Sequence, residues 1–181
     1  MQYKFSRTTR VEASAITAWR YEGPYAIYNT TPDDPASLAE MLDRRSPYYT
    51  VRDAEGQIIG FFDFGTSALV WDYGTPGIYI DGRTVPIGLG MRPDQTGKGQ
   101  GLSFVKAGLE FARQRFRPER FCLYVFTWNT RAIRVYERAG FRGGRVLVRD
   151  NEQGSFEFLE MQRDGEIHKA LSAQEISGEK A

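Results

Sequence analysis

Three closely spaced glycines in the stretch MRPDQTGKGQG, residues 91–101, are the first candidates for chemistry. Gly97, Gly99 and Gly101 alternate with other residues, and Lys98 lies between the first two. Glycine is costly inside helices and strands, so such a cluster indicates backbone that turns sharply or comes close to another group. Successive backbone N–H groups at the start of a helix bind anions, and a lysine adds a positive charge there. The stretch therefore predicts a phosphate-binding loop, with a plain surface turn as the alternative.

Two familiar phosphate loops do not match this stretch. A P-loop has the pattern Gly-x-x-x-x-Gly-Lys-Ser/Thr, whereas Gly99 follows Lys98 here and leaves no hydroxyl group for magnesium. The dinucleotide-binding pattern Gly-x-Gly-x-x-Gly fails because Leu102 stands where the third glycine is needed. Both mismatches disfavour a nucleotide-binding module. The remaining possibility is a loop that binds the pyrophosphate of coenzyme A.

A second motif follows the loop. Asn129 is followed seven residues later by Tyr136, and then by a Gly-Phe pair at 140–141. In this order and spacing, the two motifs resemble the acetyl-CoA-binding core of the GNAT superfamily of N-acetyltransferases. The loop signature of that family, Gln/Arg-x-x-Gly-x-Gly/Ala, falls on residues 96–101, with Thr96 in place of the usual Gln or Arg. The layout is similar to the branch that acetylates the N-termini of ribosomal proteins, which also contains enzymes acting on small amines.

The resemblance implies direct transfer of an acetyl group from acetyl-CoA, as cosubstrate, to a primary amine, without a metal ion. It assigns Tyr136 as the acid that protonates the departing thiolate. Leu89 and Met91, in the strand before the loop, would present backbone groups to the pantetheine arm, and an amide there would stabilise the oxyanion. The other residues implied in cofactor binding are Thr96, Gly97, Lys98, Gly99, Gln100, Gly101, Leu102 and Asn129.

Plainer interpretations stand beside these roles. Tyr136 lies on an apolar helix face and would also fit an ordinary core. Gly88 and Gly90 indicate a strand opened for the pantetheine arm, or else the packing of a bulky neighbour against them. The rival function is a non-catalytic acyl-CoA-binding module that keeps the fold and has lost the chemistry.

No general base stands out, because the strand at 84–91 contains no carboxylate. The candidates are a water molecule, Asp63 on the neighbouring strand, and Asp72 and Asp81 in the segment between the two strands. Cys122 lies in an apolar run and is predicted to be buried packing rather than a nucleophile. His168, the only histidine, is predicted to be solvated.

Aromatic side chains predict where the acceptor binds. Four follow the first helix and three lie in the long segment before strand 84–91: Trp19, Tyr21, Tyr25, Tyr28, Trp71, Tyr73 and Tyr79. With Glu22, Asp72 and Asp81 they would suit a cationic amine through charge attraction and cation–π contacts. The same rings would also suit a core or a dimer face. The expected acceptor is a small-molecule amine or a peptide N-terminus.

These residues must be positioned by alternating strands and helices. The apolar pattern predicts strands at 3–8, 48–53, 57–65, 84–91, 120–128, 142–149 and 155–162. It predicts helices at 12–21, 35–45, 100–116 and 129–141, the last with Asn129 as N-cap and Gly140 as C-cap. The strands that flank helix 100–116 should be parallel neighbours. The expected fold is α/β (α+β), a mixed central sheet of about seven strands with helices on both faces. The resemblance implies that the parallel pair in this sheet is splayed and holds acetyl-CoA.

The chain as a whole has the composition of one globular domain. It has 181 residues, of which 41% are hydrophobic and 26% charged, and its net charge is +1. This charge favours neither nucleic acid nor a membrane surface as a partner, and no apolar signal peptide opens the sequence. The single cysteine excludes an internal disulfide and fits a cytoplasmic location. We expect one acetyltransferase domain at 1–163, a polar tail at 164–181, and a monomer or homodimer.

Overall fold

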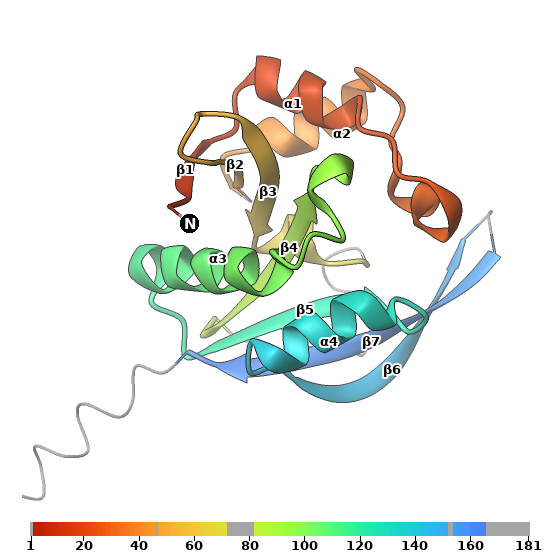
Figure 1. The fold of residues 1–181 in the computed structure, drawn as a ribbon. Coiled ribbons are helices and arrows are strands. Elements are labelled where there is room, and N and C mark those ends of the chain that lie inside the picture. The colour runs from red at the N-terminus through yellow and green to blue at the C-terminus, as the bar shows by residue number, and fades with distance from the viewer. Residues whose placement is uncertain (1, 46, 72–81, 152–153, 166–181) are drawn as a thin grey trace, which may run out of the picture.

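The computed structural model describes residues 2–45, 47–71, 82–151 and 154–165. Within these ranges, seven strands form one sheet in the order β1-β2-β3-β4-β5-β7-β6 (Figure 1). The strands are β1 (Lys4–Arg7), β2 (Tyr48–Arg52), β3 (Ile58–Phe64), β4 (Thr84–Met91), β5 (Arg120–Phe126), β6 (Arg142–Asn151) and β7 (Gly154–Asp164). The α-helices are α1 (Arg10–Thr17), α2 (Pro35–Leu42), α3 (Gly101–Phe116) and α4 (Thr130–Arg138). Short 3-10 helices are η1 (Gly23–Tyr28), η2 (Thr66–Ala68) and η3 (Pro93–Gln95).

Helices cover both faces of the sheet, as Figure 1 shows. Strand β3 shows how the faces divide, because its side chains alternate in direction. Phe62 and Phe64 belong to the main core, which the sheet shares with α3 and α4. Phe61 packs instead against the smaller cluster built from α1 and α2. Asp63 alternates with Phe62 and Phe64 and therefore lies on the α1/α2 face.

Helix α3 lies close to the sheet because small residues face large ones across the contact. The ring of Phe62 occupies the place that a Cβ of Gly108 would take. Phe104 and Ala112, on the same side of the helix, are fully buried. Tight packing of this kind fixes the helix axis, and with it the position of the helix N-terminus at the end of β4.

The first helix differs from the predicted range of 12–21. It begins at Arg10 because Thr9 and Glu12 form a capping box, in which each side chain accepts from the other residue's backbone N–H. It ends at Thr17, and the backbone then leads into η1 at Gly23. The aromatic segment after α1 is therefore not helical up to residue 21 as predicted.

The other predicted elements are present with smaller differences at their ends. Helix α2 begins at Pro35 after the N-cap Asp34 and ends at Leu42, and β5 ends at Phe126. The mixed sheet of seven strands with helices on both faces confirms the predicted fold class. Among the helices of the described ranges, none combines the length and the apolar character that a membrane crossing requires.

The parallel pair at the centre of the sheet separates after a short contact. Strands β4 and β5 pair only over Thr84–Pro86 and Arg120–Cys122, although both strands continue further. Figure 1 shows the two strands diverging from this contact. The sheet is thus open on one side of its centre, between residues 87–91 and 123–126.

Candidate functional site

The hydrogen bonds of β4 to β3 determine which of its backbone groups face this opening. Arg92 donates its backbone N–H to the carbonyl of Ile59 at 2.8 Å, and Gly65 donates to the carbonyl of Pro86 at 3.1 Å. The register between these two bonds is continuous. Since neighbouring residues of an antiparallel strand bond alternately to one side and the other, the even-numbered residues of β4 from Pro86 bond to β3.

The odd-numbered residues Ile87, Leu89 and Met91 therefore direct their backbone groups into the opening. Two of them, Leu89 and Met91, are those predicted to meet the pantetheine arm. One of these groups has a partner already, because the Tyr21 hydroxyl donates to the Met91 carbonyl at 2.7 Å. An extended ligand with amide groups fits the remaining edge, as an added strand would. Cofactor binding at Leu89 and Met91 stays a prediction.

Gly88 and Gly90 make room for bulky neighbours, the plainer of their two explanations, and a role in admitting the pantetheine arm stays a prediction. The register between β3 and β4 shows no shift at either glycine, so neither marks a bulge. A Cβ at Gly88 would collide with the carboxylate of Asp63, and one at Gly90 with the ring of Phe61. These glycines make room for side chains of β3 on the α1/α2 face.

The glycine loop follows β4 directly and leads into α3. Gly97 and Gly99 have φ angles of 75° and 76°, a region that favours glycine, and a Cβ at either would meet nothing within 4 Å. A Cβ at Gly101 would lie 3.3 Å from Val135 of α4, so this glycine lets the two helices approach. The loop is thus open to solvent at its turn and packed at its helical end.

The start of α3 has the character of an anion site. Gln100 is the N-cap, and no side chain caps the helix. The first backbone N–H groups, including those of Gly101 and Leu102, therefore have no partner within the helix. Lys98 is exposed beside them. The Thr96 hydroxyl donates to the Pro93 carbonyl at 2.8 Å, so at the position of the usual Gln or Arg the side chain closes a local turn.

Asn129 and two tyrosines connect the β4 side of the opening with the β5 side. The Asn129 side chain caps α4 by accepting from the backbone N–H of Ala132 at 3.2 Å, and it donates to the Tyr28 hydroxyl at 2.9 Å. Tyr28 and Tyr21 pack edge to face. Because Tyr21 bonds to β4 and Tyr28 to the residue before α4, the segment after α1 spans the opening. Both polar groups of Asn129 are used here, and its contact with a cofactor stays a prediction.

Tyr136 lies on α4 and packs toward the main core. Its ring packs partly buried against the main core and contacts Phe141, with ring centroids 6.1 Å apart. Burial raises the pKa of the Tyr136 hydroxyl, and the nearby Tyr28 raises it further. The hydroxyl is therefore protonated at neutral pH and can act as a donor. The same packing also suits the core role that the sequence left open.

The predicted site residues thus gather around the opening from two directions. Leu89, Met91 and residues 96–102 follow one another from β4 into α3. Asn129 and Tyr136 belong to the step from β5 into α4. Gly101 of α3 lies next to Val135 of α4, so the two strand-to-helix connections are close together.

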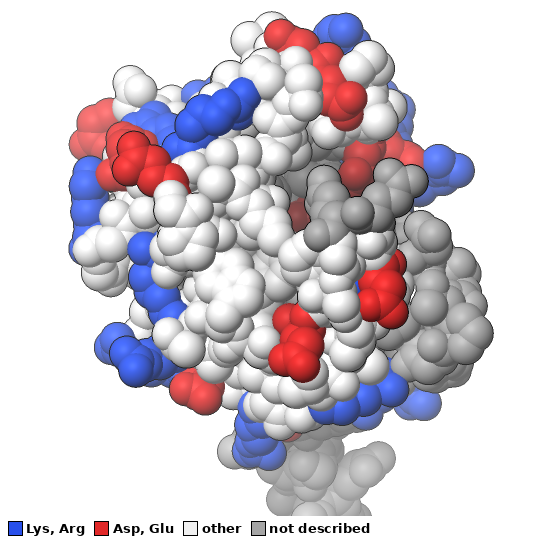
Figure 2. Space-filling view, turned by 90° about the vertical axis from the view of Figure 1, so that its right-hand side faces the viewer, with Lys and Arg blue, Asp and Glu red and all other residues white. Residues whose placement is uncertain are grey.

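An aromatic wall lies beside the opening on the β5 side. Tyr28, Phe126 and Trp128 pack in sequence, with centroid distances of 5.6 Å and 5.4 Å. Tyr25 contacts Trp128, and the guanidinium of Arg131 lies 4.3 Å from the Tyr25 ring centroid. Figure 2 shows a broad uncharged area in the middle of one face of the molecule, with acidic and basic side chains around it.

The remaining aromatic candidates are divided between separate places. Trp19 packs with Phe61 on the α1/α2 face, whereas Trp71 contacts Tyr124 and Phe158. Cys122 is buried, as predicted. No group of three or more potential metal ligands occurs in the described ranges. The candidates Asp72, Tyr73, Tyr79, Asp81 and His168 lie outside the described residues.

A cluster around Asp63 contains residues that the sequence did not indicate. Tyr48 of β2 lies directly opposite Asp63 in the strand register and donates its hydroxyl to Glu40 of α2 at 3.0 Å. Burial raises the pKa of Asp63 to about 7, and the negative charge of Glu40 raises it as well, while a hydrogen bond from Ser67 acts in the other direction. The hairpin register could have indicated Tyr48, but the approach of Glu40 depends on how α2 packs.

Comparisons with known proteins agree with this architecture. Residues 13–141 match the acetyltransferase (GNAT) family. A mycothiol acetyltransferase from Clavibacter sepedonicus is 34% identical over 115 residues, which are 64% of this chain and 30% of that protein. Another from Salinispora arenicola is 43% identical over 53 residues, 29% of this chain and 17% of that protein. The chain therefore spans about a third or less of the length of these curated relatives.

Solved structures resemble the fold over nearly its whole length. A chimera of the spermidine N-acetyltransferase SpeG from Vibrio cholerae and hSSAT has a TM-score of 0.69 at 18% identity, covering 91% of this chain and 96% of that one. A dodecameric spermidine N-acetyltransferase from the same organism has a TM-score of 0.65 at 18% identity, covering 94% and 98%. At these identities the likeness concerns the fold. The family match covers most of the described chain, and the protein belongs to the GNAT family of acetyltransferases.

Proposed function

We propose that the protein transfers an acetyl group from acetyl-CoA to a primary amine. The observation that carries the proposal is the open edge of β4 directly beside an uncapped helix N-terminus. The first suits an extended amide-containing arm, and the second suits a pyrophosphate. A single ligand that has both parts in this order is an acyl-coenzyme A. Membership in the GNAT family supports the same cosubstrate.

The residues present fit this cosubstrate. The backbone of residues 97–102 would hold the pyrophosphate, with Lys98 adding a positive charge, and Leu89 and Met91 would bind the pantetheine arm. Acetyl-CoA supplies the activated acyl group as a thioester. In the transfer a C–N bond forms and the C–S bond breaks, with its electron pair going to sulfur. A backbone N–H at the open edge of β4 would stabilise the negative charge on the carbonyl oxygen.

Tyr136 would supply the proton that the departing sulfur needs. Its hydroxyl remains protonated at neutral pH because burial raises its pKa. After donating its proton, the phenolate would take up a proton from water, which restores the acid for the next turnover. Proton donation by Tyr136 would distinguish an enzyme from a non-catalytic acyl-CoA-binding module, because such a module would need no acid.

The acceptor is proposed to be a small-molecule amine or a peptide N-terminus. The wall of Tyr25, Tyr28, Phe126 and Trp128 lies beside the opening and offers aromatic faces to a cationic group. The curated relatives are named mycothiol acetyltransferases, and one solved structure with a similar fold is named a spermidine N-acetyltransferase. The second name supports an amine as the acceptor.

The proposal is tested by measuring release of coenzyme A from acetyl-CoA across a panel of amines. The panel should contain primary alkylamines, spermidine, amino sugars and short peptides with free N-termini. We expect at least one acceptor to give release that depends on enzyme and amine, and an acetylated product with a mass increase of one acetyl group. Tight binding of acetyl-CoA without turnover on any acceptor would favour the non-catalytic module instead.

A further inference from the structure

We infer that Asp63 is the proton acceptor for the amine, an inference that rests on the acetyl transfer proposed above. A cationic amine cannot attack a thioester until it loses a proton, so a site that works at neutral pH gains from a base close to the reacting groups. The sequence left this role open between Asp63, two other aspartates and water. The structure favours Asp63 by its place and its partners, none of which is a cation among the residues that the structure describes.

The carboxylate of Asp63 lies against the part of β4 that borders the opening. Asp63 and Gly88 are directly opposite each other in the register of β3 and β4. The carboxylate oxygens occupy the space where a side chain of Gly88 would stand. Ile87 and Leu89, on either side of Gly88, direct their backbone groups into the opening. Asp63 is therefore one residue away from the edge where the thioester would lie.

The other buried carboxylates of the described ranges have cationic partners. Glu12 forms an ion pair with Arg52 at 2.7 Å, and Glu160 forms one with Arg145 at 3.0 Å. Asp63 is as deeply buried, at 4% exposure, but its neighbours in the described part of the chain are Ser67, Tyr48 and the acidic Glu40. A buried carboxylate without a cation is costly to keep ionised. Because the ionised form is disfavoured, Asp63 binds a proton more tightly than an exposed carboxylate would.

Tyr48 and Glu40 form the acidic side of the surroundings of Asp63. Tyr48 lies across the strand pair from Asp63, and its hydroxyl donates to Glu40, which is exposed on α2. Asp63 would accept a proton from the amine, directly or through one water molecule, and the electron pair of the broken N–H bond would stay on nitrogen for the attack. Asp63, then a neutral carboxylic acid, would release this proton to solvent after the acetylated product has left. Glu40 is the one charged side chain shown to act on Asp63 among the described residues.

The first test is the pH dependence of kcat/KM for Asp63→Asn with the best acceptor from the panel. Asparagine has nearly the same shape but accepts no proton at neutral pH. At pH 7 we expect the rate to fall by about 10²–10⁴, the usual contribution of a general base. The loss should shrink at high pH, where the amine is already neutral. Affinity for acetyl-CoA, measured by calorimetry, should not change.

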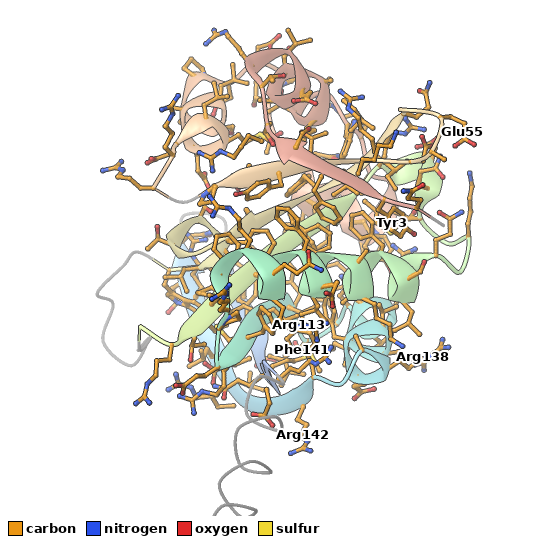
Figure 3. All side chains as sticks on the ribbon, turned by 90° about the vertical axis from the view of Figure 1, so that its left-hand side faces the viewer. Tyr3, Glu55, Arg113, Arg138, Phe141 and Arg142 are labelled. Atoms are coloured by element: carbon orange, nitrogen blue, oxygen red, sulfur yellow. The ribbon has the colours of Figure 1, made fainter. Side chains whose placement is uncertain are left out.

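The second test uses Glu40→Gln and is independent of any folding defect in the first variant. Removing the negative charge of Glu40 should lower the pKa of Asp63, because that charge raises it. The acidic limb of the rate profile should therefore move to lower pH, by up to about one unit. The matched control is Glu55→Gln, which removes an equally exposed carboxylate from the β2–β3 turn at the far end of β3 (Figure 3). The control should leave the limb in place.

The outcomes separate this inference from the function on which it rests. If the wild-type protein binds acetyl-CoA but acetylates no amine of the panel, the proposed function fails and the role of Asp63 with it. If the wild type is active and Asp63→Asn keeps its full rate at pH 7, only the inference is overturned. An acidic limb that stays in place in Glu40→Gln also overturns it, even where Asp63→Asn does not fold.

Discussion

Tyr136 and Asp63 flank the central opening from opposite faces of the sheet. Burial raises the pKa of both side chains, but the consequences differ because one is a phenol and the other a carboxyl group. The phenol keeps its proton throughout the neutral range and can only donate. The carboxyl group, with a pKa of about 7, can both accept and release a proton there. A similar environment would thus provide the proposed acid on one face and the inferred base on the other.

Replacing Tyr136 with phenylalanine separates its catalytic role from a purely structural one. The variant keeps the ring and its packing against Phe141, so the free energy of unfolding should change by no more than about 1 kcal/mol. If the hydroxyl protonates the departing thiolate, kcat should fall by roughly 10²–10⁴. Steady-state kinetics and acetyl-CoA binding should be measured together, and the dissociation constant should stay the same. A phenylalanine variant with the wild-type kcat would remove Tyr136 from the mechanism.

Asp63 should also make the stability of the fold depend on pH. Its pKa rises from 3.8 in the unfolded chain to about 7 in the folded protein, so the folded state binds the proton more tightly. The contribution of Asp63 to the free energy of unfolding should therefore be greatest below about pH 4. It should decrease as the pH rises from there through the folded-state pKa of about 7. The full difference is roughly 4 kcal/mol. Urea unfolding of the wild type and Asp63→Asn at several pH values should show a flatter dependence in the variant. Equal slopes would mean that the Asp63 carboxyl is not perturbed.

At the scale of the elements, the glycine loop combines a turn with a helix start. Gly97 and Gly99 have left-handed backbone directly before α3, and backbone of this kind can turn successive N–H groups toward an anion. The third glycine, Gly101, serves the approach of α4. The three alternate glycines therefore have two different causes, although their spacing in the sequence is uniform.

Alanine substitutions can isolate the loop's contribution to binding. Gly99 and Gly56 have φ angles of 76° and 81°, and a Cβ at either meets nothing within 4 Å. Each alanine variant should lose about 1 kcal/mol of stability from the strained backbone. Only Gly99→Ala should weaken coenzyme A binding, because Gly56 lies in the β2–β3 turn. Calorimetric titration of both variants gives the comparison. Equal affinity in the two would place the phosphate elsewhere.

Local patterns in the sequence predicted most of the fold. Apolar spacing and caps gave the strands and helices, and the glycine loop with the Asn129–Tyr136 motif indicated the family. The contacts that complete the candidate site were not predictable in the same way. The bond from Tyr21 to the Met91 carbonyl joins residues 70 positions apart, and Glu40 reaches Tyr48 only because α2 packs on the sheet. Such contacts depend on tertiary packing, which leaves no periodic signal in the sequence.

At the scale of the whole molecule, the opening divides the sheet into two parts. Strands β1 to β4 lie on one side, and β5, β7 and β6 on the other, joined by three residue pairs between β4 and β5. The α3–α4 contact at Gly101 and the bonds of Tyr21 and Tyr28 add further links across the division. A ligand that lies in the opening would touch both parts and hold them together.

Coenzyme A should therefore stabilise the native protein as a whole. A ligand that binds only the folded state adds about 2.7 kcal/mol at a hundredfold excess over its dissociation constant. We expect Tm to rise with coenzyme A and with acetyl-CoA in a thermal scan. Mg-ATP should give no comparable shift, since the loop lacks the hydroxyl that a P-loop offers to magnesium. A shift with Mg-ATP alone would be incompatible with the site described here.

The open edge of β4 has a consequence for the exchange of backbone hydrogens with solvent. Gly88 and Gly90 have their N–H groups bonded to β3, whereas those of Leu89 and Met91 point into the opening. In the unliganded protein, deuterium should enter at Leu89 and Met91 quickly and at the two glycines slowly, although all four lie in the same central strand. Acyl-coenzyme A would abolish this alternation by occupying the edge. Residue-resolved exchange should then show slow exchange at Leu89 and Met91 as well, because the cosubstrate would accept their hydrogen bonds as a neighbouring strand does.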